Sequence, residues 1–144
     1  MIRHAGLIAA RANGSWRGVL IQGPSGAGKS DLAIRALSLG YRLVADDRVV
    51  LWTSGGRLFG RAPDTLAGLL EVRGLDVVRL DPLPLCEVAL VVRCAAPERL
   101  PDPRTETILD VTLPAIDLDP REPSAPAKLS HALARFDGAA NRRI

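Results

Sequence analysis

The stretch Gly23–Ser30, which reads GPSGAGKS, decides the fold class of this chain. It is a full match to the phosphate-binding loop (P-loop) pattern G-x-x-x-x-G-K-[ST]. The apolar run 19–21 before it is typical of a strand, and residues 31–39 after it have helical spacing. Backbone N–H groups in such a loop and the N-terminal end of the next helix attract phosphate. The order strand, loop, helix therefore predicts an α/β fold that binds a nucleoside triphosphate.

The residues of the loop have separate expected tasks. Its glycines let the backbone curl, Lys29 carries a charge toward the β- and γ-phosphates, and the Ser30 hydroxyl suits Mg²⁺. Among 19 basic residues only Lys29 and Lys128 are lysines, so a compact ammonium is favoured at position 29. The alternative is a glycine-rich turn without a ligand, which the full pattern and its context disfavour. The predicted nucleotide-binding residues are Gly23, Pro24, Ser25, Gly26, Ala27, Gly28, Lys29 and Ser30.

Length and composition limit the remaining classes of protein. A chain of 144 residues with 47% hydrophobic and 24% charged residues predicts one globular domain over 1–144. A net charge of +3, scattered basic residues and 3% aromatics argue against nucleic-acid binding. With no signal-peptide pattern and no apolar run near 18 residues, we expect no membrane span and a cytoplasmic protein. Cys86 and Cys94 flank one predicted strand and are interpreted as buried, reduced thiols.

Apolar periodicity and turn residues predict mostly strands for the rest of the chain. A hairpin is expected at Asn13-Gly14, a surface loop at 97–107, and a loop or short helical turn at 64–70. One helix is expected to end at Gly40, and a second to run from an N-cap at Ser124 to Gly138. The predicted strands are 4–12, 16–21, 41–45, 49–52, 58–61, 77–80, 87–93 and 108–118, the last interrupted at Pro114.

Acidic residues follow the strand after the loop's own helix. Asp46 and Asp47 end strand 41–45, where a carboxylate can reach the phosphates as a Mg²⁺ ligand or as a base for a hydroxyl acceptor. A solvated pair of turn acids is the alternative, which the complete loop disfavours. Glu71 beside Arg73 is more often an exposed ion pair when taken alone.

Four segments together resemble HPr kinase/phosphorylase. They are HAG at 4–6, GVLIQGPSGAGKSDLA at 18–33, GYRLVADDRVVL at 40–51 and LEVRGL at 70–75. The resemblance implies a P-loop kinase core similar to the nucleotide-binding part of phosphoenolpyruvate carboxykinase, with a mixed sheet and flanking helices. It also implies ATP- and Mg²⁺-dependent phosphorylation of a serine of HPr, the phosphocarrier of the sugar phosphotransferase system, and its phosphorolytic reversal.

The same resemblance implies a role for individual side chains. Asp46 would be the general base, which acts as an acid in the reverse reaction, and His4 would tune it. Arg99 would stabilise the transferring phosphate. Ser30 and Glu71 would bind metal, and Asp47 would assist through metal or basic neighbours.

The chain also departs from the usual family pattern. It begins just before the kinase core, and the family's C-terminal Arg-Asn-Leu segment is missing, which predicts a short form with the C-terminal kinase domain only. The resemblance implies a homo-oligomer, with a hexamer among the assemblies it allows. Two alternatives stay open: a small-molecule kinase on the same core, and a nucleotide-sensing module without transfer activity.

Overall fold

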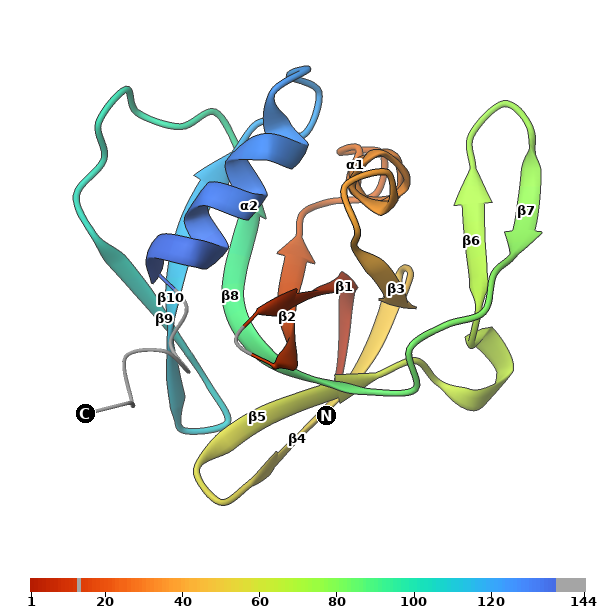
Figure 1. Cartoon of the computed structure of the whole chain (residues 1–144), viewed down its shortest axis with the longest axis horizontal. Coiled ribbons are helices and arrows are strands. Elements are labelled where there is room, and N and C mark those ends of the chain that lie inside the picture. Colours follow the sequence, from red (N-terminus) through yellow and green to blue (C-terminus); the bar gives the residue numbers. More distant parts are fainter. Residues whose placement is uncertain (13, 137–144) are drawn as a thin grey trace.

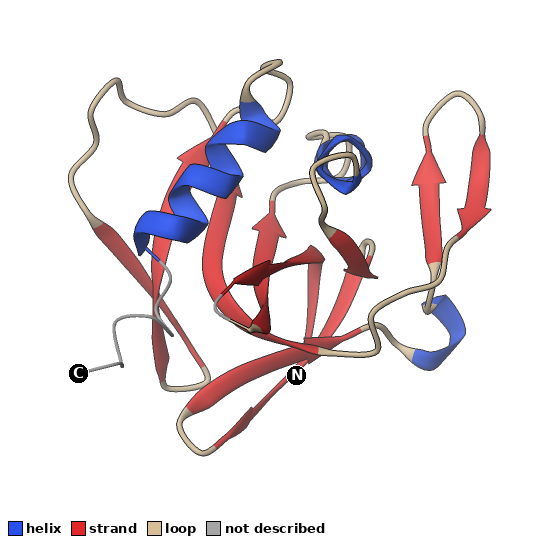
Figure 2. Cartoon of the chain, viewed as in Figure 1, coloured by secondary structure: helices blue, strands red, loops and turns tan. Residues whose placement is uncertain are grey.

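The computed structural model describes residues 1–12 and 14–136, in which two α-helices pack on one side of a mixed β-sheet (Figures 1 and 2). Aliphatic, β-branched-rich runs form the strands, and the two helices follow the predicted start signals at the loop and at Ser124. In chain order the elements are β1 (Ile2–Ala12), β2 (Ser15–Gln22), α1 (Lys29–Leu37), β3 (Arg42–Ala45), β4 (Arg48–Ser54), β5 (Arg57–Arg61), the 3-10 turn Asp64–Leu66, β6 (Leu69–Val72), β7 (Asp76–Arg79), β8 (Cys86–Cys94), β9 (Arg104–Ile108), β10 (Val111–Leu118) and α2 (Ala125–Phe136).

The sheet closes on itself because β8 has several partners. Strands are paired in the order β2-β1-β4-β5-β8-β10-β9, and β8 also pairs with β2, so five strands form a small barrel. β3 joins through β1, while β6 and β7 form a separate two-stranded hairpin. The β2–β8 and β8–β10 pairs are parallel and the other pairs are antiparallel. The predicted mixed sheet with flanking helices is therefore confirmed.

The core lies on both faces of the barrel strands. Neighbouring residues of a strand point to opposite faces, so Leu7 of β1 packs inside the barrel while Ile8 packs beneath the helices. Leu20 and Ile21 of β2 divide in the same way. All four side chains are fully buried. Burial on both faces explains why β1, β2 and β8 have nearly continuous apolar runs instead of alternating ones.

Parallel pairing places the carboxyl ends of three strands at the same edge of the sheet. β2, β8 and β10 run in one direction, so their carboxyl ends lie together. The loop Gly23–Ser30 follows β2, and the segment 119–122 follows β10 (Figure 1). Ligands of α/β proteins commonly bind outside the carboxyl ends of such strands. This edge is therefore where a site is expected.

Part of the predicted surface loop 97–107 is a strand. Its last residues belong to β9, which pairs antiparallel with β10. The prediction of a single strand over 108–118 was wrong at its start. Leu109 and Asp110 form a turn with positive φ angles of 48° and 65°, and β10 begins after it at Val111. Pro114 does not interrupt β10; it lies inside the strand, opposite Thr105. The prolines and charges of this region are typical of a loop and hid a local hairpin, which joins the main sheet through the parallel pairing of β10 with the more distant β8.

Other boundaries shift by a few residues. α1 begins at Lys29 and ends at Leu37, two residues before the predicted bounds at each end. Residues 69–72, predicted as a loop or turn and an isolated acid, form strand β6. Ala12 and Ser15 close the predicted hairpin, although Asn13 lies outside the described residues. Ser124 precedes α2 as predicted, and the predicted end at Gly138 also lies outside them.

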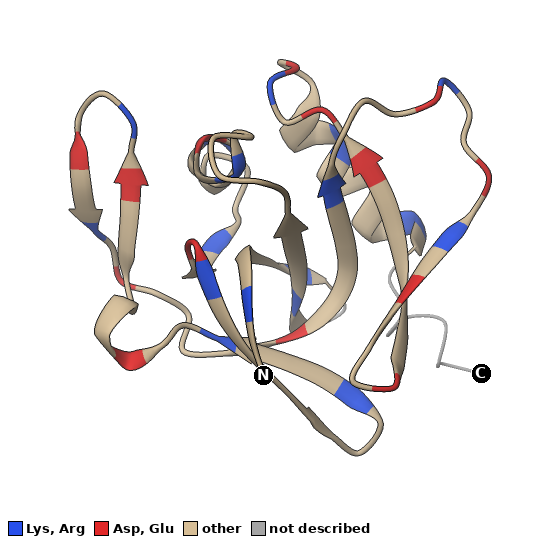
Figure 3. Ribbon diagram, turned by 180° about the vertical axis from the view of Figure 1, so that it is seen from behind, with Lys and Arg blue, Asp and Glu red and all other residues tan. Residues whose placement is uncertain are grey.

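Charged residues of both signs are interspersed along the ribbon (Figure 3). In the described part of the chain, neither helix combines the length and apolar character needed to cross a membrane.

Candidate functional site

The loop Gly23–Ser30 is curled around the side chain of Lys29. Gly26 and Gly28 have φ angles of 82° and 108°, which L-residues with a side chain rarely adopt. The Lys29 Nζ donates hydrogen bonds to the carbonyl oxygens of Gly23 and Pro24, at 2.7 and 2.9 Å. Lys29 is only 8% exposed. An ammonium has three N–H donors, so one donor remains for an anionic oxygen at the mouth of the loop.

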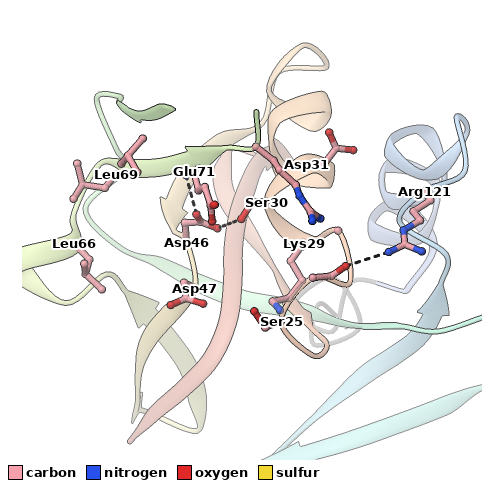
Figure 4. A pocket seen from close by; sticks show the side chains of 14 residues that line it. Ser25, Lys29, Ser30, Asp31, Asp46, Asp47, Leu66, Leu69, Glu71 and Arg121 are labelled. Carbon is pink, nitrogen blue, oxygen red and sulfur yellow. Dashed lines mark hydrogen bonds between the residues drawn. The ribbon is translucent and has the colours of Figure 1, made fainter. Parts of the chain in front are cut away.

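Asp46 links the start of α1 to the β6–β7 hairpin. The Ser30 hydroxyl donates a hydrogen bond of 2.8 Å to Asp46 Oδ1, and the Glu71 backbone N–H donates one of 3.2 Å to Asp46 Oδ2 (Figure 4). Asp46 follows β3, whose pairing with β1 places its end beside the loop. A hydroxyl and a carboxylate oxygen in contact are ligands that Mg²⁺ prefers. This pair can therefore hold the metal against a bound phosphate.

Asp47 has a different environment from Asp46. Its backbone lies in the left-handed region with φ of 70°, a conformation that Asp tolerates better than most residues. The turn is held by bonds from Arg48 N–H to the Asp46 carbonyl (2.8 Å) and from Ala5 N–H to the Asp47 carbonyl (3.0 Å). The turn separates the two carboxylates. Asp47 Oδ1 lies 3.3 Å from His4 Nδ1, and the Asp47 side chain is 56% exposed. Asp47 is thus the more accessible acid of the pair.

These groups line one pocket of about 940 Å³ (Figure 4). The loop and α1 contribute Ser25, Gly26, Gly28, Lys29, Ser30 and Asp31. Asp46 and Asp47 form its acidic part. The opposite wall comes from the 3-10 turn and the β6–β7 hairpin, with Leu66, Leu69, Glu71, Arg73 and Val77. Arg121 completes the lining from the segment after β10.

Most of the predicted site residues line the pocket, although Gly23, Pro24 and Ala27 of the loop do not. Asp46, Asp47 and Glu71 line the pocket, and His4 joins through Asp47. Arg99 is exposed in the loop between β8 and β9 and does not line the pocket, so its predicted contact with phosphate lacks support. Arg121, which belongs to none of the predicted motifs, lies there instead. Only the parallel β8–β10 pairing could have indicated it.

The donor set fits Mg²⁺ bound partly by phosphate and water. Among the described residues, no three His, Cys, Asp or Glu side chains cluster closely enough to hold a metal by themselves. Mg²⁺ usually keeps several waters and binds one or two carboxylates together with substrate phosphates. Ser30 and Asp46 supply that kind of partial set.

Both cysteines are free, as predicted, but they are not equally buried. Burial raises the pKa of the Cys86 thiol to about 12, with a further contribution from the negative charge of Glu87. Cys94 is only half-buried, which corrects the prediction of two buried thiols. It lies behind the phosphate loop, where a Cβ on Gly23 would come within 2.9 Å of the Cys94 Cβ. Burial also raises the pKa of Cys94, so neither thiol is activated.

Comparison with known proteins agrees with the predicted resemblance. The family model described as "HPr Serine kinase C-terminal domain" matches residues 13–83. HPr kinase/phosphorylase of Brevibacillus brevis is 48% identical over 64 residues, which is 44% of this chain and 21% of that protein. The Clostridium beijerinckii protein of the same name is 48% identical over 61 residues, which is 42% of this chain and 20% of that protein.

A solved structure is similar over nearly the whole chain. The Hpr(Ser) kinase/phosphatase from Coxiella burnetii aligns with a TM-score of 0.78 and 24% identity, covering 93% of this chain and 94% of that chain. At this identity the likeness establishes the mixed α/β fold alone. The matches to the two curated relatives span about a fifth of the length of those proteins.

Proposed function

This chain is a relative of the HPr serine kinase C-terminal domain, and from that premise we propose that it transfers phosphate from ATP, with Mg²⁺, to a serine of an HPr-type phosphocarrier protein. The observation that carries the proposal is the Ser30–Asp46 hydrogen bond beside the curled loop around Lys29. This hydrogen bond holds two oxygen groups that would bind Mg²⁺ beside the loop that would bind phosphate, and a second carboxylate, Asp47, lines the same pocket. This arrangement supports the proposal of a P-loop kinase core.

The loop residues would hold the nucleotide. Backbone N–H groups of the loop, the N-terminal end of α1 and the Lys29 ammonium would bind the β- and γ-phosphates. Ser30 and Asp46 would hold Mg²⁺, which would neutralise the phosphate charge when bound. Such transfer requires positioning and electrostatic stabilisation, which these fixed groups would provide.

The two adjacent acids would divide the remaining work. The family resemblance assigns the base to Asp46. The contacts favour the other assignment, because Asp46 is held by Ser30 and the Glu71 N–H, while Asp47 is exposed beside His4. We propose that Asp46 serves the metal and that Asp47 accepts the proton of the acceptor serine. Glu71, which also lines the pocket, is the proposed ligand for a second metal.

Transfer to a protein serine is tested with ATP labelled on its γ-phosphate, Mg²⁺ and HPr from the same organism. We expect label on HPr, and none on an HPr variant whose target serine is replaced by alanine. Lys29→Met should weaken ATP binding about tenfold or more, since a charge-assisted hydrogen bond is lost.

The outcomes separate the proposal from its alternatives. ATP binding without label on HPr would contradict the protein-kinase assignment and favour a nucleotide-sensing module. Label on a small metabolite from the same cells would favour a small-molecule kinase.

Incubating labelled phospho-HPr with inorganic phosphate tests the reverse reaction. We propose that the reaction regulates the phosphotransferase system in the cytoplasm. Gel filtration with light scattering tests the proposed homo-oligomer.

A further inference from the structure

We propose that Arg121 is a further phosphate-binding residue of this site, delivered to the nucleotide by the segment that connects β10 to α2. The inference rests on the proposed nucleotide site and adds a residue to it from outside the four segments that carry the family resemblance. Arg121 lines the pocket together with the phosphate loop, and its Nη2 donates a hydrogen bond of 3.1 Å to the Gly26 carbonyl (Figure 4).

The segment 119–122 holds Arg121 in a defined position. Arg35 of α1 donates from Nη1 to the Glu122 carbonyl at 3.1 Å and from Nη2 to the Pro120 carbonyl. The Asp119 side chain accepts a hydrogen bond of 3.0 Å from the Arg121 backbone N–H. Pro120 also packs closely on the loop, since a Cβ on Gly28 would lie 3.3 Å from Pro120 Cγ. The backbone that presents Arg121 is thus anchored on both α1 and the loop.

The guanidinium has donors left for a ligand. It carries five N–H donors, and its hydrogen bond among the described residues is the one from Nη2 to Gly26. Gly26 lies in the part of the loop that curls with positive φ, so this contact places the guanidinium at the rim of the phosphate-binding backbone. Arginine binds phosphate oxygens through paired N–H groups. Its position at the rim suits an anion held in the loop.

The pocket's other cations leave this side open. Lys29 lies within the loop and directs two of its donors to loop carbonyls. Arg73 comes from the β6–β7 hairpin on the opposite wall. Arg121 is the lining cation that comes from the segment before α2, so the pocket receives its three cations from three different segments of the chain. Arg121 would thereby take the role that the family resemblance implies for Arg99.

The test measures binding of ATP, ADP and AMP to the full chain by calorimetry, for the wild type, Arg121→Ala and Arg121→Lys. We expect Arg121→Ala to weaken ATP binding about 10- to 100-fold, as for the loss of a charge-assisted hydrogen bond. The loss should be smaller for ADP and smallest for AMP, and Arg121→Lys should recover part of it. The matched control is Arg135→Ala, an exposed arginine at the far end of α2, which should bind all three nucleotides like the wild type.

The dependence on phosphate number distinguishes a ligand from a structural contact. Equal losses for all three nucleotides, together with a lower thermal unfolding midpoint, would overturn the proposal and make Arg121 only a tie that holds the loop. Unchanged affinity of Arg121→Ala for ATP would overturn it as well. If the folded wild type binds no ATP, the proposed function itself is wrong. That result is distinguishable from the two outcomes above, in which the wild type binds ATP and only the role of Arg121 is contradicted.

Discussion

Replacing each acid of the Asp46-Asp47 pair by asparagine distinguishes a metal-binding role from a proton-accepting one. Asparagine keeps the size of aspartate and removes its charge. At position 46 the amide oxygen can still accept from the Glu71 N–H, and the amide NH₂ can donate to the Ser30 hydroxyl, which then acts as acceptor. The two contacts of Asp46 thus survive in neutral form. We expect Asp46→Asn to fold.

The magnitudes follow from those contacts. Two partly exposed charge-assisted hydrogen bonds become neutral, which should lower the free energy of unfolding by about 1 kcal/mol or less. Loss of the carboxylate beside Ser30 should raise the Mg²⁺ concentration needed for half-maximal transfer by about 10- to 100-fold. Asp47→Asn should instead lower kcat by about 10²- to 10⁴-fold at every Mg²⁺ concentration, as expected for loss of a general base.

The assay is phosphate transfer to HPr at increasing Mg²⁺ and saturating ATP, with urea unfolding to check each variant. Asp76→Asn is a matched control, because this exposed acid at the start of β7 is not among the residues that line the pocket. The assignment of the metal to Asp46 and of the proton to Asp47 is wrong if Asp46→Asn lowers kcat equally at all Mg²⁺ concentrations while Asp47→Asn responds to added Mg²⁺. That pattern would support the assignment implied by the family resemblance.

Three further predictions concern stability and thiol chemistry. Gly60→Ala should lower the free energy of unfolding in urea by about 1–3 kcal/mol, because the new Cβ would lie 2.6 Å from Leu7 Cδ2 inside the barrel; an unchanged midpoint would contradict this packing. Hydrogen bonds from Arg104 and Arg93 lower the pKa of Asp117 to about 2. The contribution of Asp117 to the free energy of unfolding should therefore be present above pH 4 and lost as pH falls toward 2. Asp117→Asn should therefore reduce the difference in stability between pH 5 and pH 2, and an unchanged pH profile would count against the interaction. Under native conditions at pH 8 a thiol reagent should modify Cys94 before Cys86, because burial raises the pKa of Cys86 to about 12. Mass spectrometry over time measures the order of labelling, and modification of Cys86 first would contradict the prediction.

Local sequence determined the loop and the elements around it. The pattern of Gly23–Ser30 specifies backbone curvature, and positive φ angles at Gly26 and Gly28 provide it. The strands before and after the loop, the helix α1 and the acid pair at the end of β3 were predictable because each depends on neighbouring residues. Hydrophobic periodicity and turn residues carry that kind of information.

Long-range pairing determined the rest. The β9–β10 hairpin was missed because its prolines and charges are typical of a loop, and only pairing with β8 makes the region part of the sheet. Three contacts of the site join residues that are distant in the chain. They are Asp46 with Ser30, Asp47 with His4, and Arg121 with Gly26. A sequence pattern indicates which side chains can bind phosphate or metal. Which of them meet depends on the direction of the strands that carry them, and this is decided when the barrel closes.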